Sequence, residues 1–291
     1  MAGKTLEIRA SSASTSPSPG VRSEEVVAKL IDTSSCIGCK ACEVACQEWN
    51  DLAPETTVQM GTYQTLPETT PHFWNLIKFQ EHETDDGGLQ WLMRKDQCMH
   101  CADPGCMKAC PAPSAIVQYE NGIVDFQQEN CIGCGYCISG CPFNVPKMNH
   151  TAKKVYKCTL CNDRVSVGLQ PACIKACPTS CLTFGTKSDL LLKAESRVKQ
   201  LKTAGFDQAK VYDPEGVGGT SVVTILALGD KPELYGLPAN PTIPLSVEAW
   251  KGPLKWVGNL AIAAGLLGTA LHYLRYGAKH VKATGTGAQG D

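Results

Sequence analysis

The stretch NCIGCGYCISGCPF, residues 130–143, places four cysteines within eleven consecutive positions. Their spacing is C-x₂-C-x₂-C-x₃-C, and a proline follows the last cysteine. Cysteines at i and i+4 of a helix present both sulfurs on one face, and the proline cannot continue a helix. One copy alone fits a zinc knuckle, a disulfide knot or half of a redox site, so the rest of the chain decides.

The chain repeats this pattern. Of its 17 cysteines, sixteen fall into four groups that each end in C-x₃-C, and Cys181 lies outside them. Groups two, three and four then carry a proline, whereas Gln47 follows group one, whose helix is therefore predicted to run on through Trp49. The groups are Cys36, Cys39, Cys42 and Cys46 (group one); Cys98, Cys101, Cys106 and Cys110 (group two); Cys131, Cys134, Cys137 and Cys141 (group three); Cys158, Cys161, Cys173 and Cys177 (group four).

The spacing distinguishes between the kinds of site that cysteines can form. Disulfides within such short loops would be strained or redundant. Structural zinc draws two ligands from each of two separated pairs, and covalent haem needs C-x-x-C-H, which no group has. C-x₂-C-x₂-C-x₃-C-P is instead the run that holds bacterial-type iron–sulfur clusters, in which the fourth cysteine ligates the other cluster of a pair. Sixteen cysteines predict four 4Fe–4S clusters. Nearby cations are candidates to offset their negative charge: Lys40, Lys95, Lys108, Lys147, Lys157, Arg164 and Lys175.

Composition and patterning predict an α+β protein of several segments. The 291 residues carry a formal net charge of -1, so no nucleic-acid partner is expected. Two hairpins are predicted, over 73–96 and around Asn121-Gly122 in 115–126, then a strand at 182–185, a helix capped by Thr186 and stopped by Gly205, and a strand within 220–228. The segments are an N-terminal arm (1–27) without a signal peptide, a four-cluster domain (28–185), a helix–strand extension (186–250), a transmembrane helix (251–277) and a flexible tail (278–291).

The transmembrane helix is predicted from an uncharged run. No formal charge occurs from Trp256 to Leu274, and residues 256–276 as a helix would span about 31 Å, close to a bilayer core. Trp256 at one end, and Tyr273 and Tyr276 at the other, match interfacial belts. Small residues on one face permit close approach of a partner helix, and an intramembrane histidine indicates a functional site. The predicted partner face is Ala261, Gly265, Gly268 and His272.

These features together resemble a known family. The chain is similar to the iron–sulfur β subunit of membrane-bound respiratory formate dehydrogenase. The stretches that carry the likeness are LIDTSSCIGCKACEVACQEWND, WLMRKDQCMHCADPGCMKACP, NGIVDFQQENCIGCGYCISGCPFNVP, VYKCTLCNDRVSVG and VYDPEGVGGT. The resemblance implies two interleaved ferredoxin-like dicluster units with inserted β hairpins, followed by one C-terminal membrane helix.

The resemblance also implies which cysteines share a cluster. In that family, groups one and four fold together, as do groups two and three, and each fourth cysteine crosses to the neighbouring site. The implied sets are Cys36, Cys39, Cys42 and Cys177 (set a); Cys46, Cys158, Cys161 and Cys173 (set b); Cys98, Cys101, Cys106 and Cys141 (set c); Cys110, Cys131, Cys134 and Cys137 (set d). Cys181 fits no set and is expected to be a buried free thiol.

As the resemblance implies, the chain has no catalytic site of its own and conducts electrons from a molybdopterin-containing catalytic α subunit to a membrane cytochrome b γ subunit that reduces quinone. It also implies the cytoplasmic (inner) membrane, with the cysteine domain on the periplasmic side and the C-terminus cytoplasmic. Two alternatives remain open. One is the equivalent subunit of a membrane hydrogenase or another molybdenum oxidoreductase, and the other is a zinc-binding structural membrane protein.

Overall fold

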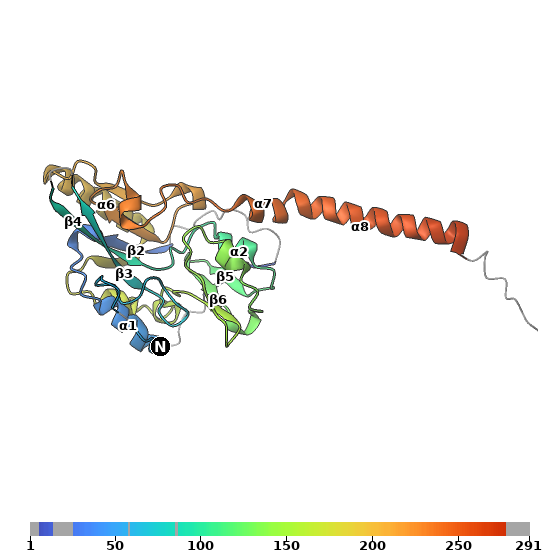
Figure 1. Ribbon diagram of the computed structural model, residues 1–291, viewed down its shortest axis with the longest axis horizontal. Helices are drawn as coiled ribbons and strands as arrows, with labels where there is room; N and C mark the ends of the chain where they lie inside the picture. The colour runs from blue at the N-terminus through green and yellow to red at the C-terminus, as the bar shows by residue number, and fades with distance from the viewer. Residues whose placement is uncertain (1–5, 14–25, 58, 85–86, 278–291) are drawn as a thin grey trace, which may run out of the picture. The chain divides into compact units, whose positions relative to one another are not determined.

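The computed structural model describes residues 6–13, 26–57, 59–84 and 87–277. The chain separates into two compact units, Met1–Val247 and Glu248–Asp291. The first unit contains every cysteine and combines small sheets with short helices (Figure 1). The second contains the apolar helix. The mixed α+β class with one candidate membrane helix is therefore confirmed.

A four-stranded sheet joins the two ends of the cysteine region. Its order is β10-β11-β2-β9, with β2 parallel to β11 and antiparallel to β9. The strands are β2 Val27–Asp32, β9 Leu182–Thr186, β10 Lys210–Tyr212 and β11 Val222–Leu226. The strands predicted near 182–185 and 220–228 are confirmed. Because β2 lies between β9 and β11, residues 186–247 fold with the cysteine region in one unit.

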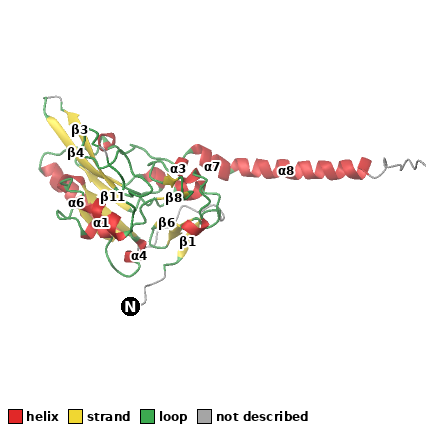
Figure 2. Cartoon of the chain, turned by 60° about the horizontal axis from the view of Figure 1, so that its bottom comes forward, coloured by secondary structure: helices red, strands yellow, loops and turns green. Residues whose placement is uncertain are grey.

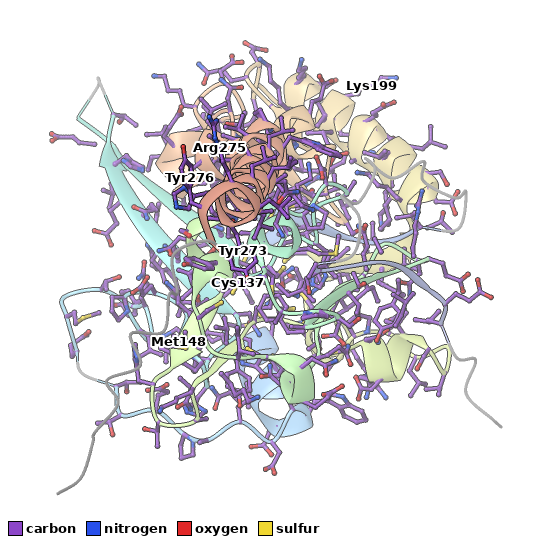
Figure 3. The ribbon with its side chains drawn as sticks, turned by 90° about the vertical axis from the view of Figure 1, so that its right-hand side faces the viewer. Cys137, Met148, Lys199, Tyr273, Arg275 and Tyr276 are labelled. Atoms are coloured by element: carbon purple, nitrogen blue, oxygen red, sulfur yellow. The ribbon has the colours of Figure 1, made fainter. Side chains whose placement is uncertain are left out.

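Helix α6, Lys187–Thr203, packs on this sheet. Its predicted N-cap is confirmed, because the Thr186 hydroxyl accepts a hydrogen bond from the Asp189 backbone N–H. Gly205, at φ 95°, follows the helix end in a conformation that glycine adopts readily. Leu190 lies on the buried face, whereas Lys199 lies on the exposed face (Figure 3).

In the described residues, three antiparallel hairpins carry most of the remaining sheet structure (Figure 2). The two predicted hairpins are confirmed, and the turn of the shorter one has Gly122 at φ 86° with the Asn121 side chain accepting from the Ile123 N–H. The third hairpin, β7–β8, has no counterpart among the sequence predictions. The strands are β3 Leu76–Glu83, β4 Leu89–Asp96, β5 Ile116–Tyr119, β6 Val124–Phe126, β7 Lys147–Asn149 and β8 Lys154–Tyr156.

The described part of the N-terminal arm is anchored to the first unit. Strand β1, Ile8–Ser11, pairs antiparallel with β5. The Ser12 hydroxyl donates to the Ala112 carbonyl at 2.7 Å and accepts from the Ile116 N–H at 3.0 Å. Residues 14–25, which include most of the serine- and proline-rich stretch, lie outside the described residues.

The helices of the cysteine groups differ from the prediction in length. Helix α1 contains both Cys42 and Cys46 and reaches Trp49 as predicted. The prediction that one helix carries both final cysteines is wrong for groups two, three and four, where the helix ends before the last cysteine. A proline disfavours helical conformation in the residue directly before it, which is the last cysteine in each of these groups. The helices are α1 Ala41–Trp49, α2 Gly105–Ala109, α3 Tyr136–Ser139, α4 Asn162–Val165 and α5 Ala172–Lys175.

The second unit is helical. Helix α7 covers Leu245–Lys251, α8 covers Pro253–His272, and a π-helical turn follows over Tyr273–Gly277. Among the described residues, one helical segment, Leu245–Gly277, is long and apolar enough to cross a membrane, and an 18-residue window within it has a mean hydropathy of 1.4. It begins earlier than the predicted 251–277. The predicted tail, 278–291, lies outside the described residues.

Candidate iron–sulfur sites

The opening stretch does not form a self-contained site. Burial, followed by the nearby thiols of Cys110, Cys131 and Cys134, raises the pKa of the Cys137 thiol to about 12. Such mutual effects require the sulfurs to be close together. Cys137 and Met148, both labelled in Figure 3, belong to the same apolar cluster. Group three therefore shares its first three cysteines with Cys110 of group two, as set d describes.

The fourth cysteine of group three lies elsewhere. Burial raises the pKa of Cys101 well above its usual value, and the neighbouring thiols of Cys141, Cys98 and Cys106 add to that shift. Cys141 thus lies among the first three cysteines of group two. Set c is brought together by the close packing of α2 and α3.

Groups one and four exchange cysteines in the same way. Burial raises the pKa of Cys46, and together with the nearby thiols of Cys158, Cys173 and Cys161 it brings that pKa to about 12. Cys46 comes from the last turn of α1, and the other three thiols belong to group four. The structure therefore gathers the cysteines of set b from both ends of the cysteine region.

The cysteines of set a line a small apolar cavity beside the loop that precedes α1. The cavity is bordered by all four set a cysteines and also by Cys181 and the apolar side chain of Ile77. Burial raises the pKa of Cys42 to about 11. Cys181 therefore lies close to set a, and five cysteines border one cavity. The sequence did not reveal this proximity.

The four sets are arranged in series. A thiol of one set raises the pKa of a thiol in the next set, and each such pair also lies in one apolar cluster of the described residues. The linking pairs are Cys42 with Cys173, Cys98 with Cys158, and Cys106 with Cys137. The order is a, b, c, d, which spacing in the sequence does not reveal.

A buried lysine contacts set b directly. Lys29 is 1% exposed, and its Nζ donates to Cys173 Sγ at 3.1 Å and to Gln97 Oε1 at 3.0 Å. Burial opposes the charge, yet the thiolates of Cys173 and Cys158 raise the pKa of Lys29 above its ordinary value. Sequence reasoning missed this residue. The available signal was a lysine in the otherwise apolar strand VAKLI.

Two of the predicted charge-offsetting lysines are also buried. Lys157 Nζ donates to the Val124 carbonyl at 2.5 Å and the Cys158 carbonyl at 3.0 Å. Burial opposes its charge, but its pKa is raised, chiefly by Cys98. Lys95 Nζ is buried without a hydrogen-bond partner and lines the set a cavity. A buried, unpaired ammonium is costly, so this cavity suits a negatively charged group.

The other predicted cations have different surroundings. They pair with carboxylates, lie over aromatic rings or are exposed, and among them Lys40 also lines the set a cavity. Lys108 pairs with Asp103 at 2.7 Å, Lys147 with Glu68 at 2.5 Å, Arg164 lies over the Trp49 ring, Lys40 over the Phe79 ring, and Lys175 is exposed.

The donor set fits 4Fe–4S clusters. In the part of the chain that the structure describes, no three His, Cys, Asp or Glu side chains are close enough to hold one metal ion. A cluster with iron at four corners needs its ligand sulfurs farther apart than a single tetrahedral zinc does. Backbone N–H groups also point at sulfur, from His100 to Cys98 Sγ and from Leu160 to Cys158 Sγ, both at 3.4 Å. Such donors stabilise thiolate ligands.

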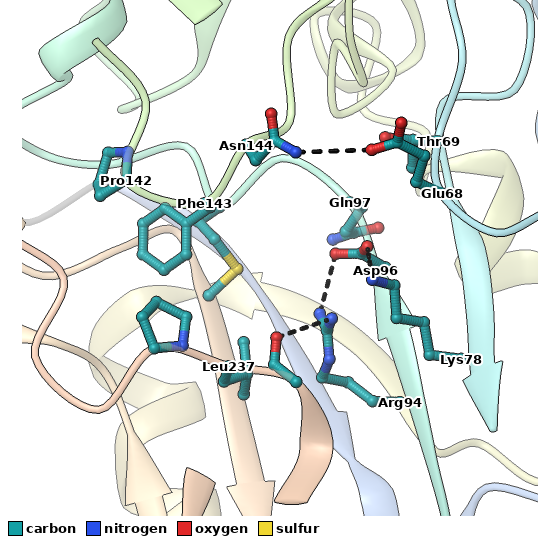
Figure 4. Close-up of a pocket in the computed structure, with 13 residues that line it drawn as sticks. Glu68, Thr69, Lys78, Arg94, Asp96, Gln97, Pro142, Phe143, Asn144 and Leu237 are labelled. Atoms are coloured by element: carbon teal, nitrogen blue, oxygen red, sulfur yellow. Dashed lines mark hydrogen bonds and ion pairs between the residues drawn. The ribbon is translucent and has the colours of Figure 1, made fainter. Parts of the chain in front are cut away.

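A separate polar cavity of about 240 Å³ has no cysteine in its lining (Figure 4). Three of its charged residues pair with one another: Asp96 bonds to Arg94 at 3.0 Å and to Lys78 at 3.3 Å. Arg94 Nε also donates to the Tyr235 carbonyl at 2.6 Å. These contacts fix the β3–β4 hairpin against the segment around Tyr235.

Comparison with family models covers most of the chain. Residues 35–115 and 89–187 each match a 4Fe-4S dicluster domain. Residues 243–284 match a model described as formate dehydrogenase N, transmembrane. The chain is therefore an iron–sulfur protein with dicluster domains, and it is anchored to a membrane.

Curated relatives agree over almost the full length. The nitrate-inducible formate dehydrogenase iron-sulfur subunit of Escherichia coli (strain K12) is 53% identical over 281 residues, which covers 95% of each chain. The formate dehydrogenase iron-sulfur subunit of Haemophilus influenzae is 54% identical over 275 residues, 94% of this chain and 88% of the relative. With these identities and the two dicluster matches, the chain belongs to the family of formate dehydrogenase iron–sulfur subunits.

Proposed function

We propose that the chain conducts electrons through four 4Fe–4S clusters, from a formate-oxidising molybdopterin α subunit to a membrane cytochrome b γ subunit that reduces quinone. The observation that carries this proposal is the series of four thiol sets, a to d, within one unit. Each bound cluster accepts and releases one electron. The protein supplies the thiolate ligands, the buried lysines near them and the spacing between successive sites.

The ligands we propose are those of sets a to d, four for each cluster. Support comes from the pKa effects within each set and from the shared lining of the set a cavity. Serine substitution of one ligand in each set should alter four different reduced-state EPR signals. Two variants from different sets that alter the same signal contradict the assignment.

The two ends of the series have features of docking surfaces. At the set a end, Cys39 is exposed beside Ile37, which is 60% exposed, and at the set d end, Cys134 is exposed beside Ile132, which is 65% exposed. Exposed apolar residues next to a redox site favour contact with a partner protein. We assign the set a end to the catalytic subunit and the set d end to the cytochrome, because the chain leaves the first unit through Ile243, which packs near Gly105 of α2.

The membrane helix provides a further contact with the cytochrome. Ala261, Gly265, Gly268 and His272 recur at helical spacing on one face of α8. A side chain added at Gly265 or Gly268 meets nothing within 4 Å in this chain. Gly265→Leu with Gly268→Leu should therefore release the cytochrome in detergent without unfolding this helix.

The matched control for that experiment lies on the opposite face of α8. Ala263→Leu with Ala270→Leu adds the same kind of bulk away from the proposed contact. The cytochrome should remain bound in this control. Retention of the cytochrome by the glycine double variant contradicts docking through this face.

We also propose that the cysteine unit lies on the periplasmic side of the cytoplasmic membrane. Arg275, Lys279 and Lys282 follow the helix and favour a cytoplasmic C-terminus, whereas Lys251 and Lys255 precede it and weaken the charge difference. A reporter enzyme that is active only in the cytoplasm, fused after Asp291, should be active. An inactive fusion of normal abundance contradicts this orientation.

The decisive experiment is anaerobic purification of the membrane complex that contains the chain. Sixteen irons in this chain, four reduced-cluster EPR signals and a formate-oxidising large subunit are expected, since four clusters hold four irons each. Formate should reduce all four clusters. Reduction by hydrogen alone identifies the hydrogenase alternative, and zinc without iron identifies the structural zinc protein.

A further inference from the structure

The end of strand β4 separates two cavities of the first unit. Met93 and Lys95 line the set a cavity, whereas Arg94 and Asp96 line the polar cavity shown in Figure 4. Successive side chains of a strand point to opposite faces, so this division follows from the order of residues 93–96, MRKD. The strand therefore directs one lysine toward the set a cysteines.

The two faces of the β3–β4 hairpin differ in how their charges are compensated. On the polar face, Asp96 pairs with Arg94 at 3.0 Å and with Lys78 at 3.3 Å. On the other face, Lys95 lies opposite Ile77 of β3, which also lines the set a cavity. Lys95 is 3% exposed, and its Nζ has no hydrogen-bond partner. The face toward set a thus carries an uncompensated charge.

The buried carboxylate of Glu43 does not supply the missing partner. Glu43 follows the set a residue Cys42 in α1. Its Oε1 accepts from the Ile77 N–H at 2.5 Å, and its Oε2 accepts from the Thr65 hydroxyl at 2.7 Å. The Glu43 carboxylate is therefore held by these two donors and makes no hydrogen bond to Lys95 Nζ.

Lys40, the other lysine that lines the set a cavity, has different surroundings. It is only partly buried, and its Nζ lies 5.8 Å from the centre of the Phe79 ring. Solvent screens a charge at such a position, whereas it screens a buried charge much less. Lys95 is thus the lysine of this cavity whose charge neither water nor a protein group compensates.

A buried ammonium without a partner is strongly destabilising, and an apolar side chain of similar volume in its place is often neutral or stabilising. A group that enters the cavity with negative charge removes this penalty. The four thiolates of set a, with the 4Fe–4S core that they hold, are such a group. Lys95 therefore matches the charge of the occupied cavity and not that of the empty one.

We propose that Lys95 is the electrostatic partner of the set a cluster: its ammonium compensates the negative charge of that cluster and raises its reduction potential. Reduction adds one negative charge, and a positive charge held nearby in the protein interior favours the reduced state. The inference rests on the proposed function, because it requires a cluster at set a. It makes the first cluster of the series a favourable acceptor of electrons from the catalytic subunit.

The experiment compares Lys95→Met, which keeps the length of the side chain and removes its charge, with Lys95→Arg, which keeps a charge. Reduction potentials are measured by EPR-monitored titration of the intact, anaerobically purified complex. The set a signal is the one that Cys42→Ser alters. Met should lower the potential of that signal most, and Arg should remain closer to the wild type. The inference is overturned if Met leaves that potential unchanged, or if Arg and Met lower it equally.

Two further variants separate burial from charge alone. Lys78→Met removes a positive charge from the other face of the same hairpin, and Lys40→Met removes the screened charge of the same cavity. Both should lower the set a potential less than Lys95→Met, and an equal effect of either overturns the inference.

Lys95→Gln replaces the methionine variant if that protein assembles poorly, since it removes the charge and remains polar. Its set a potential should also lie below that of the wild type, and an unchanged potential overturns the inference. Wild-type protein with fewer than four clusters contradicts the proposed function instead. Four clusters with no effect at Lys95 contradict this inference alone.

Discussion

Groups one and three have the same cysteine spacing but different local structures. In group one, α1 runs for nine residues and includes both final cysteines. In group three, α3 is four residues long and ends before Cys141. The residue after the last cysteine differs: Gln47 donates to the His72 carbonyl at 3.0 Å, whereas Pro142 disfavours a helical Cys141. The same cysteine spacing therefore occurs with two local structures, and the residue after the last cysteine accounts for the different helix lengths.

The two ends also differ in charge. At sets a and b, Lys95 borders the set a cavity and Lys29 donates directly to a thiol. At set d, Lys154 Nζ donates to the carbonyls of Cys131 and Gln128, both at 2.6 Å, and not to sulfur. A buried ammonium close to the thiols stabilises the reduced, more negative cluster more than an ammonium that is hydrogen-bonded to backbone carbonyls does. We therefore expect higher reduction potentials at sets a and b than at set d.

The largest effect should come from the crossing cysteine of group three. Cys141→Ser should perturb the cluster of set c and leave that of set d, although Cys141 belongs to the group three stretch. Formate-to-quinone electron transfer should fall by more than the about 10- to 100-fold typical of outer-shell changes. Iron content and EPR of the reduced complex check this, and loss of the set d signal with a normal set c signal contradicts it.

Substitution of the buried lysine should have the next largest effect. Lys29→Met removes the donor to Cys173, so the potential of the set b cluster should fall and its retention should weaken by about 10- to 100-fold. Lys154→Met is the matched control at the other end, and it should change the potentials much less. Redox titration of both variants checks this comparison. Equal shifts in reduction potential would contradict the proposed difference in charge between the two ends.

Two glycines allow a comparison of how well the backbone tolerates a side chain at the set a end and at the set d end. Gly38 and Gly133 have φ values of 64° and 68°, so alanine at either costs about 1–2 kcal/mol. An added Cβ at Gly38 would meet the movable Phe79 ring at 2.7 Å, whereas one at Gly133 would overlap the Lys153 carbonyl oxygen. Gly133→Ala should therefore lose more iron on chelator challenge than Gly38→Ala. The reverse order would show that the aromatic contact at the set a end is the more rigid.

The smallest effect is expected at Lys175. It is exposed and lies close in sequence to Cys173 and Cys177, yet no ion pair is found for it in the described structure. Lys175→Gln should change thermal stability by less than about 0.5 kcal/mol and leave all four potentials unchanged. A shift in a set a or b potential would mean that sequence proximity matters as much as burial.

The sequence predicts those features that depend on neighbouring residues. The cysteine spacing, the Asn121-Gly122 turn and the Thr186 cap are local signals, and each has its expected counterpart in the structure. The pairing of β1 with β5 and the contact of Lys29 with Cys173 join distant segments. No periodic sequence pattern reveals either contact. Strand β1 is short and polar, and the contact of Lys29 with Cys173 depends on how the chain folds. The serial order of the sets depends on the same long-range packing.

The position of β2 between β9 and β11 has a consequence for biosynthesis. Sets c and d require only residues up to Cys141, so their cysteines are complete while the chain is still being made. Set a must wait for Cys177, and the sheet that supports it must wait for β11. With the proposed ligand sets, the N-terminal cysteine group is therefore synthesised first and completed last.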